Sequence, residues 1–232
     1  MTIRTNPREE KPVTERAAVL MKHEAYERIV AMLEAGAVKP GQMITQRELM
    51  ALAGVTLGSV REAVPRLEAE GLLETRPKRG LMVPSLDVRF VREAYRLRRM
   101  LELEALSATD SDLPDALVLD WISRHETLRE RLASSGEPAL IAEFLAFDWE
   151  MHKRIVGAMG NRLVDNLYRV NTVKVRMATQ SGKRIGPDNS RRVIDEHLRF
   201  LRPLAEGRVQ DACRALGQHI DNSLDIALGR DP

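Results

Sequence analysis

Four polar side chains lie on apolar stripes of helix-spaced sequence, and their types are those of metal ligands. Asp148 and His152 stand four residues apart, so they share one face of a helix with apolar neighbours. His197 and His219 each lie three residues after an isoleucine or a leucine. A divalent metal would stabilise the buried carboxylate and accept lone pairs from three neutral imidazoles. The alternative is four separate core residues, with histidines bonded to backbone carbonyls and an ordinary Asp–His pair.

A buried arginine is the second unusual feature of the same half of the chain. Arg98 shares a helical stripe with valine, alanine and leucine, and a guanidinium in such a place needs a carboxylate. Glu102, one turn later, could supply it from within the chain, and a bound small organic acid could supply it from outside. Asn171 lies inward on another stripe and could add a hydrogen bond to that acid.

Helices must position these side chains, because the sequence after residue 87 has helical periodicity throughout. Glycine, proline, serine and asparagine clusters divide it into six predicted helices. The predicted ranges are 87–107, 114–135, 138–158, 161–181, 188–206 and 208–228. An antiparallel helical bundle with a site built in its core is therefore expected.

The first 84 residues predict a winged helix-turn-helix. TQRE at 45–48 and SVRE at 59–62 both fit the capping box, so two helices should begin there, separated by a glycine-containing turn at 53–56. Two short apolar stretches around a basic centre at 73–83 predict a β-hairpin. Pro65 should remove one hydrogen bond from the second helix and could bend it.

This order of elements resembles the N-terminal domain of the GntR family of bacterial regulators over roughly residues 25–84. The matching motifs are QREL at 46–49, GVT at 54–56, VREA at 60–63, LEAEGL at 67–72 and RG at 79–80. The resemblance implies binding of double-stranded operator DNA by Arg47, Thr56, Ser59, Arg61, Arg79 and Gly80. The chain departs from the family at Leu57, where many members have arginine, and at Gly58.

The second half resembles the effector-binding FCD domain of the FadR subfamily of the same family. LRRMLE at 97–102, FDWEMH at 147–152, DEH at 195–197 and GQH at 217–219 carry the resemblance. It implies that Asp148, His152, His197 and His219 bind a divalent metal, zinc first, with nickel, iron or manganese as alternatives. It also implies that Arg98 binds a small organic acid whose other oxygens complete the coordination of the metal.

Composition sets the remaining expectations for the 232 residues. The sequence predicts a mobile arm at 1–20, a DNA-binding domain at 21–84 and an effector and dimerisation domain at 85–232.

The net charge of +2 is too small to indicate nucleic-acid binding by itself. No apolar run reaches the roughly 18–20 residues of a membrane span, and no signal peptide is evident, so a cytoplasmic protein without a membrane partner is expected. Cys213, the single cysteine, should be an ordinary core residue.

These features predict a mostly α-helical, metabolite-responsive transcriptional regulator, with repression as the expected mode. Two chains in a homodimer would bind a palindrome, and the acid would change the placement of the two winged domains. Two alternatives stay open. A metal-dependent enzyme acting on a small carboxylate would show turnover, although the sequence shows no inward acid besides the ligand Asp148, no nucleophile and no motif that is placed as a general base. A metal-free acyl-ligand sensor would contain no metal as purified.

Overall fold

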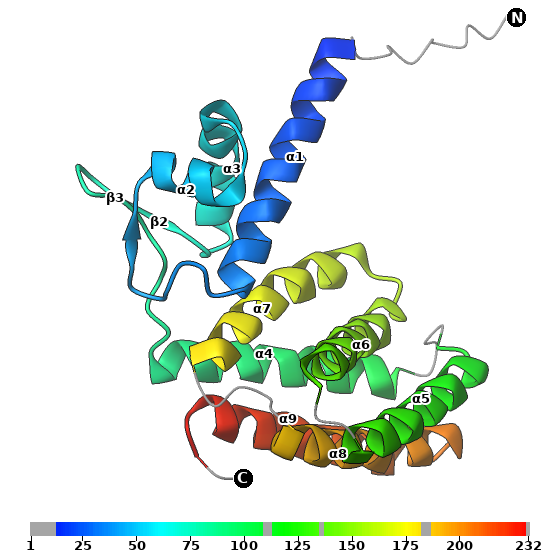
Figure 1. Cartoon of the computed structure of the whole chain (residues 1–232). Helices are drawn as coiled ribbons and strands as arrows, with labels where there is room; N and C mark the ends of the chain where they lie inside the picture. Colours follow the sequence, from blue (N-terminus) through cyan, green and yellow to red (C-terminus); the bar gives the residue numbers. More distant parts are fainter. Residues whose placement is uncertain (1–12, 109–112, 135–136, 182–186, 231–232) are drawn as a thin grey trace, which may run out of the picture. The chain divides into compact units, whose positions relative to one another are not determined.

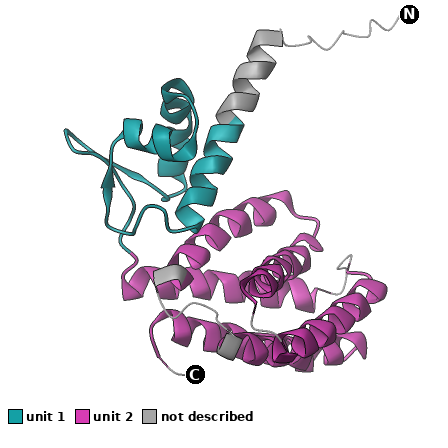
Figure 2. Ribbon diagram, viewed as in Figure 1, with its two compact units in different colours: residues 1–85 teal, residues 86–232 magenta. Residues whose placement is uncertain are grey.

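A computed structural model of the chain describes residues 13–108, 113–134, 137–181 and 187–230. The chain divides into two compact units between Ser85 and Leu86 (Figure 2). Each unit has its own hydrophobic core, so each is described separately. None of the helices in the described ranges is both long enough and apolar enough to cross a membrane.

The first unit is a winged helix-turn-helix (Figure 1). Its elements are α1 (Val13–Glu34), β1 (Met43–Ile44), α2 (Gln46–Ala53), α3 (Leu57–Ala69), β2 (Glu74–Arg76) and β3 (Gly80–Met82). The sheet has the order β1-β3-β2 with antiparallel neighbours, and Thr75 lies opposite Leu81 in the hairpin. The hairpin expected at 73–83 is therefore present, whereas β1 was not expected. Segment 1–12 of the expected arm lies outside the described residues, and α1 already begins at Val13.

The start of α2 follows the predicted capping box. Thr45 accepts from the backbone N–H of Glu48 at 3.2 Å, and the carboxylate of Glu48 accepts from the backbone N–H of Thr45 at 2.7 Å. These reciprocal bonds satisfy two backbone donors at the end of the helix.

The second predicted capping box, at 59–62, is wrong. The structure begins α3 at Leu57, and Thr56 is the N-cap because it has extended backbone and accepts from the N–H of Ser59 at 3.1 Å. Ser59 is buried in the first turn instead. The helix continues through Pro65 to Ala69, so the proline does not end it.

The second unit is a bundle of the helices α4 (Val88–Ser107), α5 (Asp115–Ser134), α6 (Pro138–Gly157), α7 (Arg162–Ser181), α8 (Pro187–Ala205) and α9 (Val209–Ala227). All six bounds agree with the predicted ranges to within one residue. Helix α8 packs against both α5 and α9, while α4 packs against α6, α7 and α9. Large apolar side chains such as Tyr95, Phe144 and Phe200 are fully buried between them. Burying each one contributes roughly 1.5–3 kcal/mol, so the core holds the polar residues of the site in place.

Candidate metal centre and DNA-reading surface

Three histidines from three helices converge in the core of the second unit. His152 lies on α6, His197 on α8 and His219 on α9, and all are buried. The Nε2 atom of His197 lies 3.4 Å from that of His152 and 3.3 Å from that of His219. Their ligand atoms all fall within 4.8 Å of one another, a spacing that could hold one metal ion. The sequence prediction that these residues come together is thus met in the geometry.

Asp148 adds a carboxylate to the same point. Its Oδ1 atom lies 3.4 Å from Nε2 of His152 and 3.2 Å from Nε2 of His197, and it has no hydrogen-bond partner of good geometry among the described residues. Burial by itself raises the pKa of this carboxyl, but the bond and charge of His152 and the charge of Arg98 lower it overall. A buried, ionised oxygen beside two of three clustered imidazoles is a donor set that fits a divalent cation.

The outer ring nitrogen of each histidine has its own partner. Nδ1 of His152 lies 2.7 Å from Oε2 of Glu102, and Nδ1 of His219 lies 2.8 Å from Oε2 of Glu196. Nδ1 of His197 lies 2.9 Å from Nε2 of His125. A carboxylate can only accept, so His152 and His219 donate from Nδ1 to their glutamates. Partners of this kind orient the rings of metal-binding histidines and fix their tautomers.

Arg98 makes the internal ion pair that the sequence allowed. Its Nε atom donates to Oε1 of Glu102 at 2.7 Å, and the hydroxyl of Tyr168 donates to the same oxygen at 2.7 Å. Burial alone would raise the pKa of Glu102, yet Arg98 and His152 lower it below its usual range. The pairing therefore keeps a charged network in the core of the bundle.

Arg98 nevertheless retains an unused donor. Its Nη2 atom is buried and has no hydrogen-bond partner within the described part of the chain, and the same holds for the hydroxyl of Tyr95. Burial raises the pKa of Tyr95 to about 12, so this hydroxyl stays protonated and can donate. Two buried donors next to the histidine cluster are suited to an anionic ligand.

Asn171 has a different contact from the one expected. It is buried, and its Nδ2 atom donates to the backbone oxygen of Ala94 at 2.9 Å, which ties α7 to α4. This bond gives the side chain a role in packing the helices. It lends no support to a bond between Asn171 and an effector.

Two members of this network were not predicted from the sequence. Three inward histidines were expected, and His125 is a fourth, fully buried on α5. Trp121 and Leu128 lie four residues before it and three after it and are buried too, so the stripe test used for the others would have found it. Glu196 is the other: it is buried beside the imidazole of His219, a contact between α8 and α9 that periodicity does not predict. Glu102, expected as a partner of Arg98, is buried as well and also lies beside His152.

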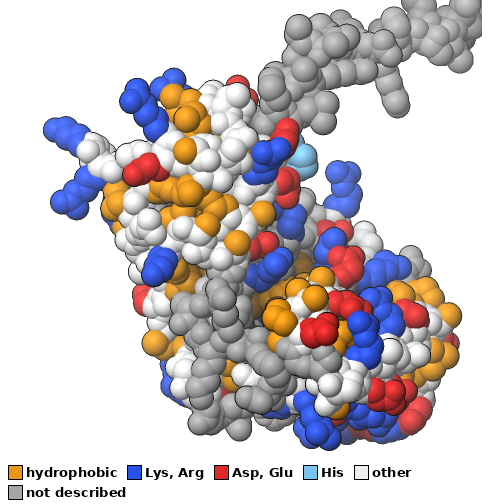
Figure 3. All heavy atoms as spheres, in the orientation of Figure 1, with side chains coloured by type: hydrophobic (Ala, Val, Ile, Leu, Met, Phe, Trp, Pro, Cys, Tyr) orange, Lys and Arg blue, Asp and Glu red, His pale blue; other side chains and the backbone are white. Residues whose placement is uncertain are grey.

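The DNA-reading residues expected in the first unit fall into two groups. Arg47, Arg61, Arg79 and Thr56 are exposed, and Figure 3 shows Lys and Arg side chains projecting at the hairpin end of this unit. Ser59 is buried, with its hydroxyl 2.9 Å from that of Thr56, so it serves the start of α3. The buried position gives no access to a nucleic acid.

Gly80 has a structural reason to be glycine. Its φ is +105°, and a Cβ atom there would lie 2.9 Å from the backbone oxygen of Ile44 in the neighbouring strand. Any larger residue would separate β3 from β1 and move the hairpin. Gly80 thus positions Arg79 at the tip whether or not it touches DNA itself.

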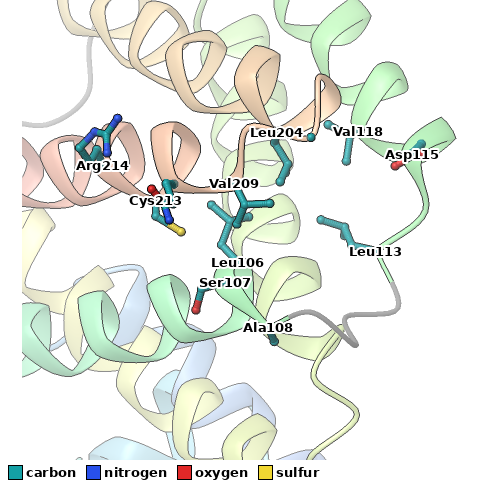
Figure 4. A pocket seen from close by; sticks show the side chains of 12 residues that line it. Leu106, Ser107, Ala108, Leu113, Asp115, Val118, Leu204, Val209, Cys213 and Arg214 are labelled. Atoms are coloured by element: carbon teal, nitrogen blue, oxygen red, sulfur yellow. The ribbon is translucent and has the colours of Figure 1, made fainter.

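A surface pocket of about 800 Å³ lies elsewhere in the second unit (Figure 4). It is formed at the end of α4, the start of α5 and the first turns of α9, and neither the clustered histidines nor Arg98 line it. Cys213 lines this pocket and is only partly buried. Burial raises the pKa of its thiol, which lowers the fraction of reactive thiolate at neutral pH.

Comparisons with known proteins agree with both units. The family model "Bacterial regulatory proteins, gntR family" matches residues 21–83, and the FCD domain model matches residues 93–222. The "Nta operon transcriptional regulator" of Aminobacter aminovorans is 29% identical over 82% of this chain and 89% of its own length. An uncharacterized HTH-type regulator of Streptomyces ambofaciens is 30% identical over 60% of this chain and 57% of its own. The structure of E. coli McbR/YncC superposes with a TM-score of 0.66 at 18% identity, covering 90% of this chain and 97% of that one, which indicates a shared fold.

Proposed function

This chain belongs to the GntR family of bacterial regulators, with an FCD domain, and we propose that its second unit senses a small organic acid beside a divalent metal ion. Membership of this family makes the chain a metabolite-responsive, DNA-binding transcriptional regulator and not an enzyme. The observation that carries the proposal is the convergence of three buried histidines, with Oδ1 of Asp148 3.2 Å from Nε2 of His197 and 3.4 Å from Nε2 of His152. A divalent ion at this point would offset the cost of burying an ionised carboxylate.

The metal ligands would be Asp148, His152, His197 and His219. Three imidazole nitrogens and one carboxylate oxygen suit zinc, and they also suit nickel, iron or manganese according to supply. When bound, the ion supplies positive charge and a coordination position for an anionic oxygen. The residues of the chain hold the ligand rings in place through Glu102, Glu196 and His125.

The acid would be recognised by Arg98. Its Nε is used by Glu102, and the buried Nη2 is available to a carboxylate, with the hydroxyl of Tyr95 as a second donor. A small acid is favoured over a long acyl chain because Glu102 links Arg98 directly to His152, which places the guanidinium close to the proposed metal ligands. A metal-free acyl sensor would have no use for the unpaired oxygen of Asp148.

The first unit would bind a palindromic operator as part of a homodimer. Arg47 and Arg61 are exposed on α2 and α3, and Arg79 is exposed at the tip of the hairpin, where a winged helix contacts DNA. Acid binding would shift the population of dimer arrangements, with repression relieved or imposed accordingly.

The test is a thermal-shift screen of small organic acids on the purified protein, with its metal content measured in parallel. We expect about one divalent ion per chain and an acid that raises the melting temperature. Arg98→Met should abolish the response to the acid and keep the metal. Arg99→Met is the matched control, since Arg99 pairs with Asp221 on the half-exposed surface and should respond like the wild type. A protein that binds no metal, or an Arg98→Met variant with an unchanged response, would contradict the proposal.

A further inference from the structure

His125 stands apart from the other buried histidines because it is not aimed at the point where their Nε2 atoms meet. Its Nδ1 lies 2.7 Å from the backbone oxygen of Trp121, one turn earlier on α5. Its Nε2 lies 2.9 Å from Nδ1 of His197 on α8. The side chain is fully buried, so both contacts are made away from water.

These two contacts fix where the hydrogen atoms lie. A backbone carbonyl can only accept, so Nδ1 of His125 carries the hydrogen and donates it to Trp121. A neutral imidazole has one N–H, so Nε2 of His125 must accept, and Nδ1 of His197 must donate to it. Burial lowers the pKa of both rings, to about 4 for His125, which agrees with two neutral imidazoles.

The same reasoning places the lone pair of His197. With its hydrogen on Nδ1, the ring has a bare Nε2, which lies 3.2 Å from Oδ1 of Asp148 and 3.3 Å from Nε2 of His219. The opposite tautomer would direct an N–H at the cluster and could not bind a metal there.

His197 differs in this respect from the other two histidines. His152 and His219 donate to carboxylates, which bring negative charge, whereas His197 donates to a neutral ring. We infer that His125 is a positioning residue, which holds His197 in the Nδ1–H tautomer and so presents its Nε2 lone pair to the metal without adding charge to the core. This inference rests on the proposed metal site, although the tautomer exists in the metal-free protein as well.

The test compares His125→Leu, which removes the acceptor, with His125→Gln, whose amide oxygen can still accept from His197 and whose amide nitrogen can donate. Long-range ¹⁵N–¹H spectra of metal-free full-length protein report the tautomer of each histidine. We expect Nδ1–H for His197 in the wild type and in His125→Gln, and a mixture or Nε2–H in His125→Leu. Zinc affinity, measured by competition with a chromophoric chelator, should fall about 10–100-fold in His125→Leu and less in His125→Gln.

Leu128→Ala is the control, because Leu128 is buried on the same helix and its loss destabilises the core without altering the bond to His197. Its zinc affinity and His197 tautomer should match those of the wild type. The inference is overturned if wild-type His197 carries its hydrogen on Nε2, which the spectra show even when His125→Leu fails to fold. It is also overturned if folded His125→Leu keeps wild-type zinc affinity. A wild-type protein that binds no divalent metal contradicts the proposed function instead, and the spectra then decide the tautomer alone.

Discussion

Glu102 connects Arg98, the proposed acid-binding residue, with a proposed metal ligand. One of its oxygens accepts from Nε of Arg98 at 2.7 Å, and the other accepts from Nδ1 of His152 at 2.7 Å. Because both groups bind the same carboxylate, a shift of the guanidinium changes the position of the imidazole, and a shift of the imidazole changes the position of the guanidinium. Binding of an acid at Arg98 and of a metal at His152 should therefore be thermodynamically linked, each changing the affinity for the other by the same factor.

Glu102→Gln should weaken metal binding and destabilise the fold together. The amide keeps the size of the side chain but leaves Arg98 buried without its counter-charge, which costs about 3–5 kcal/mol. Loss of the carboxylate behind His152 should lower metal affinity roughly 10–100-fold. Urea unfolding and competition with a chelator measure the two effects. Glu104→Gln, exposed on the same helix, should change neither, and an unaltered metal affinity in Glu102→Gln would count against the linkage.

Chelation should lower the melting temperature of the wild type more than that of His219→Ala. A metal that binds only the folded state stabilises it by about 2.7 kcal/mol when its free concentration is 100 times Kd. At roughly 2–4 °C per kcal/mol for a chain of this size, removal of the metal should cost about 5–10 °C. His219→Ala loses one ligand and with it most of this gain, and His197→Ala should behave alike. Calorimetry with and without chelator checks this, and equal shifts in wild type and variants would contradict it.

The sequence predicts the helices better than it predicts the polar network between them. Helix bounds in the second unit follow from glycine and proline breaks, which act locally. The partner Glu196 was missed because it contributes through His219 on another helix, whereas His125 lies on an apolar stripe that helical periodicity does show. In the first unit, Ser59 was assigned a capping role that Thr56 performs, since both are residue types preferred at an N-cap and only Ser59 has a glutamate three residues later. Strand β1 has only two residues, too few to show any period.

The metal-free protein should lose stability as the pH falls from 7 to 5. Burial lowers the pKa of His125, His197 and His219 below the unfolded value of about 6.5, so the unfolded chain binds more protons below that pH. Each such group lowers the free energy of unfolding by roughly 1.4 kcal/mol per pH unit, once the group is protonated in the unfolded chain and still neutral in the folded one. His152 differs, because burial lowers its pKa but the charge of Glu102 and the bonds to Asp148 and Glu102 raise it overall, so its contribution to stability grows as the pH falls and offsets part of this loss.

Urea unfolding in chelator at pH 7, 6 and 5 measures the slope. Most carboxyl groups of an unfolded chain titrate near pH 4, so the interval from 6.5 to 5 reports chiefly on imidazoles. Constant or rising stability over this interval would show that the buried rings are not held neutral.

Arg61→Ala should remove specific operator binding without unfolding the protein, and Arg47→Ala should weaken it. Both side chains are exposed, so their loss leaves the core intact, while each lost base or phosphate contact costs roughly 1–3 kcal/mol. Affinity of the wild type should fall steeply as salt rises, because each neutralised phosphate releases counterions, and the variants should show a shallower dependence. Gel shift or fluorescence anisotropy over a salt series gives both the affinity and its salt dependence.

Arg89→Ala serves as the control, since Arg89 is an exposed arginine of the second unit paired with Glu93. Specific binding that survives the double substitution of Arg47 and Arg61 would mean that α2 and α3 do not face the DNA.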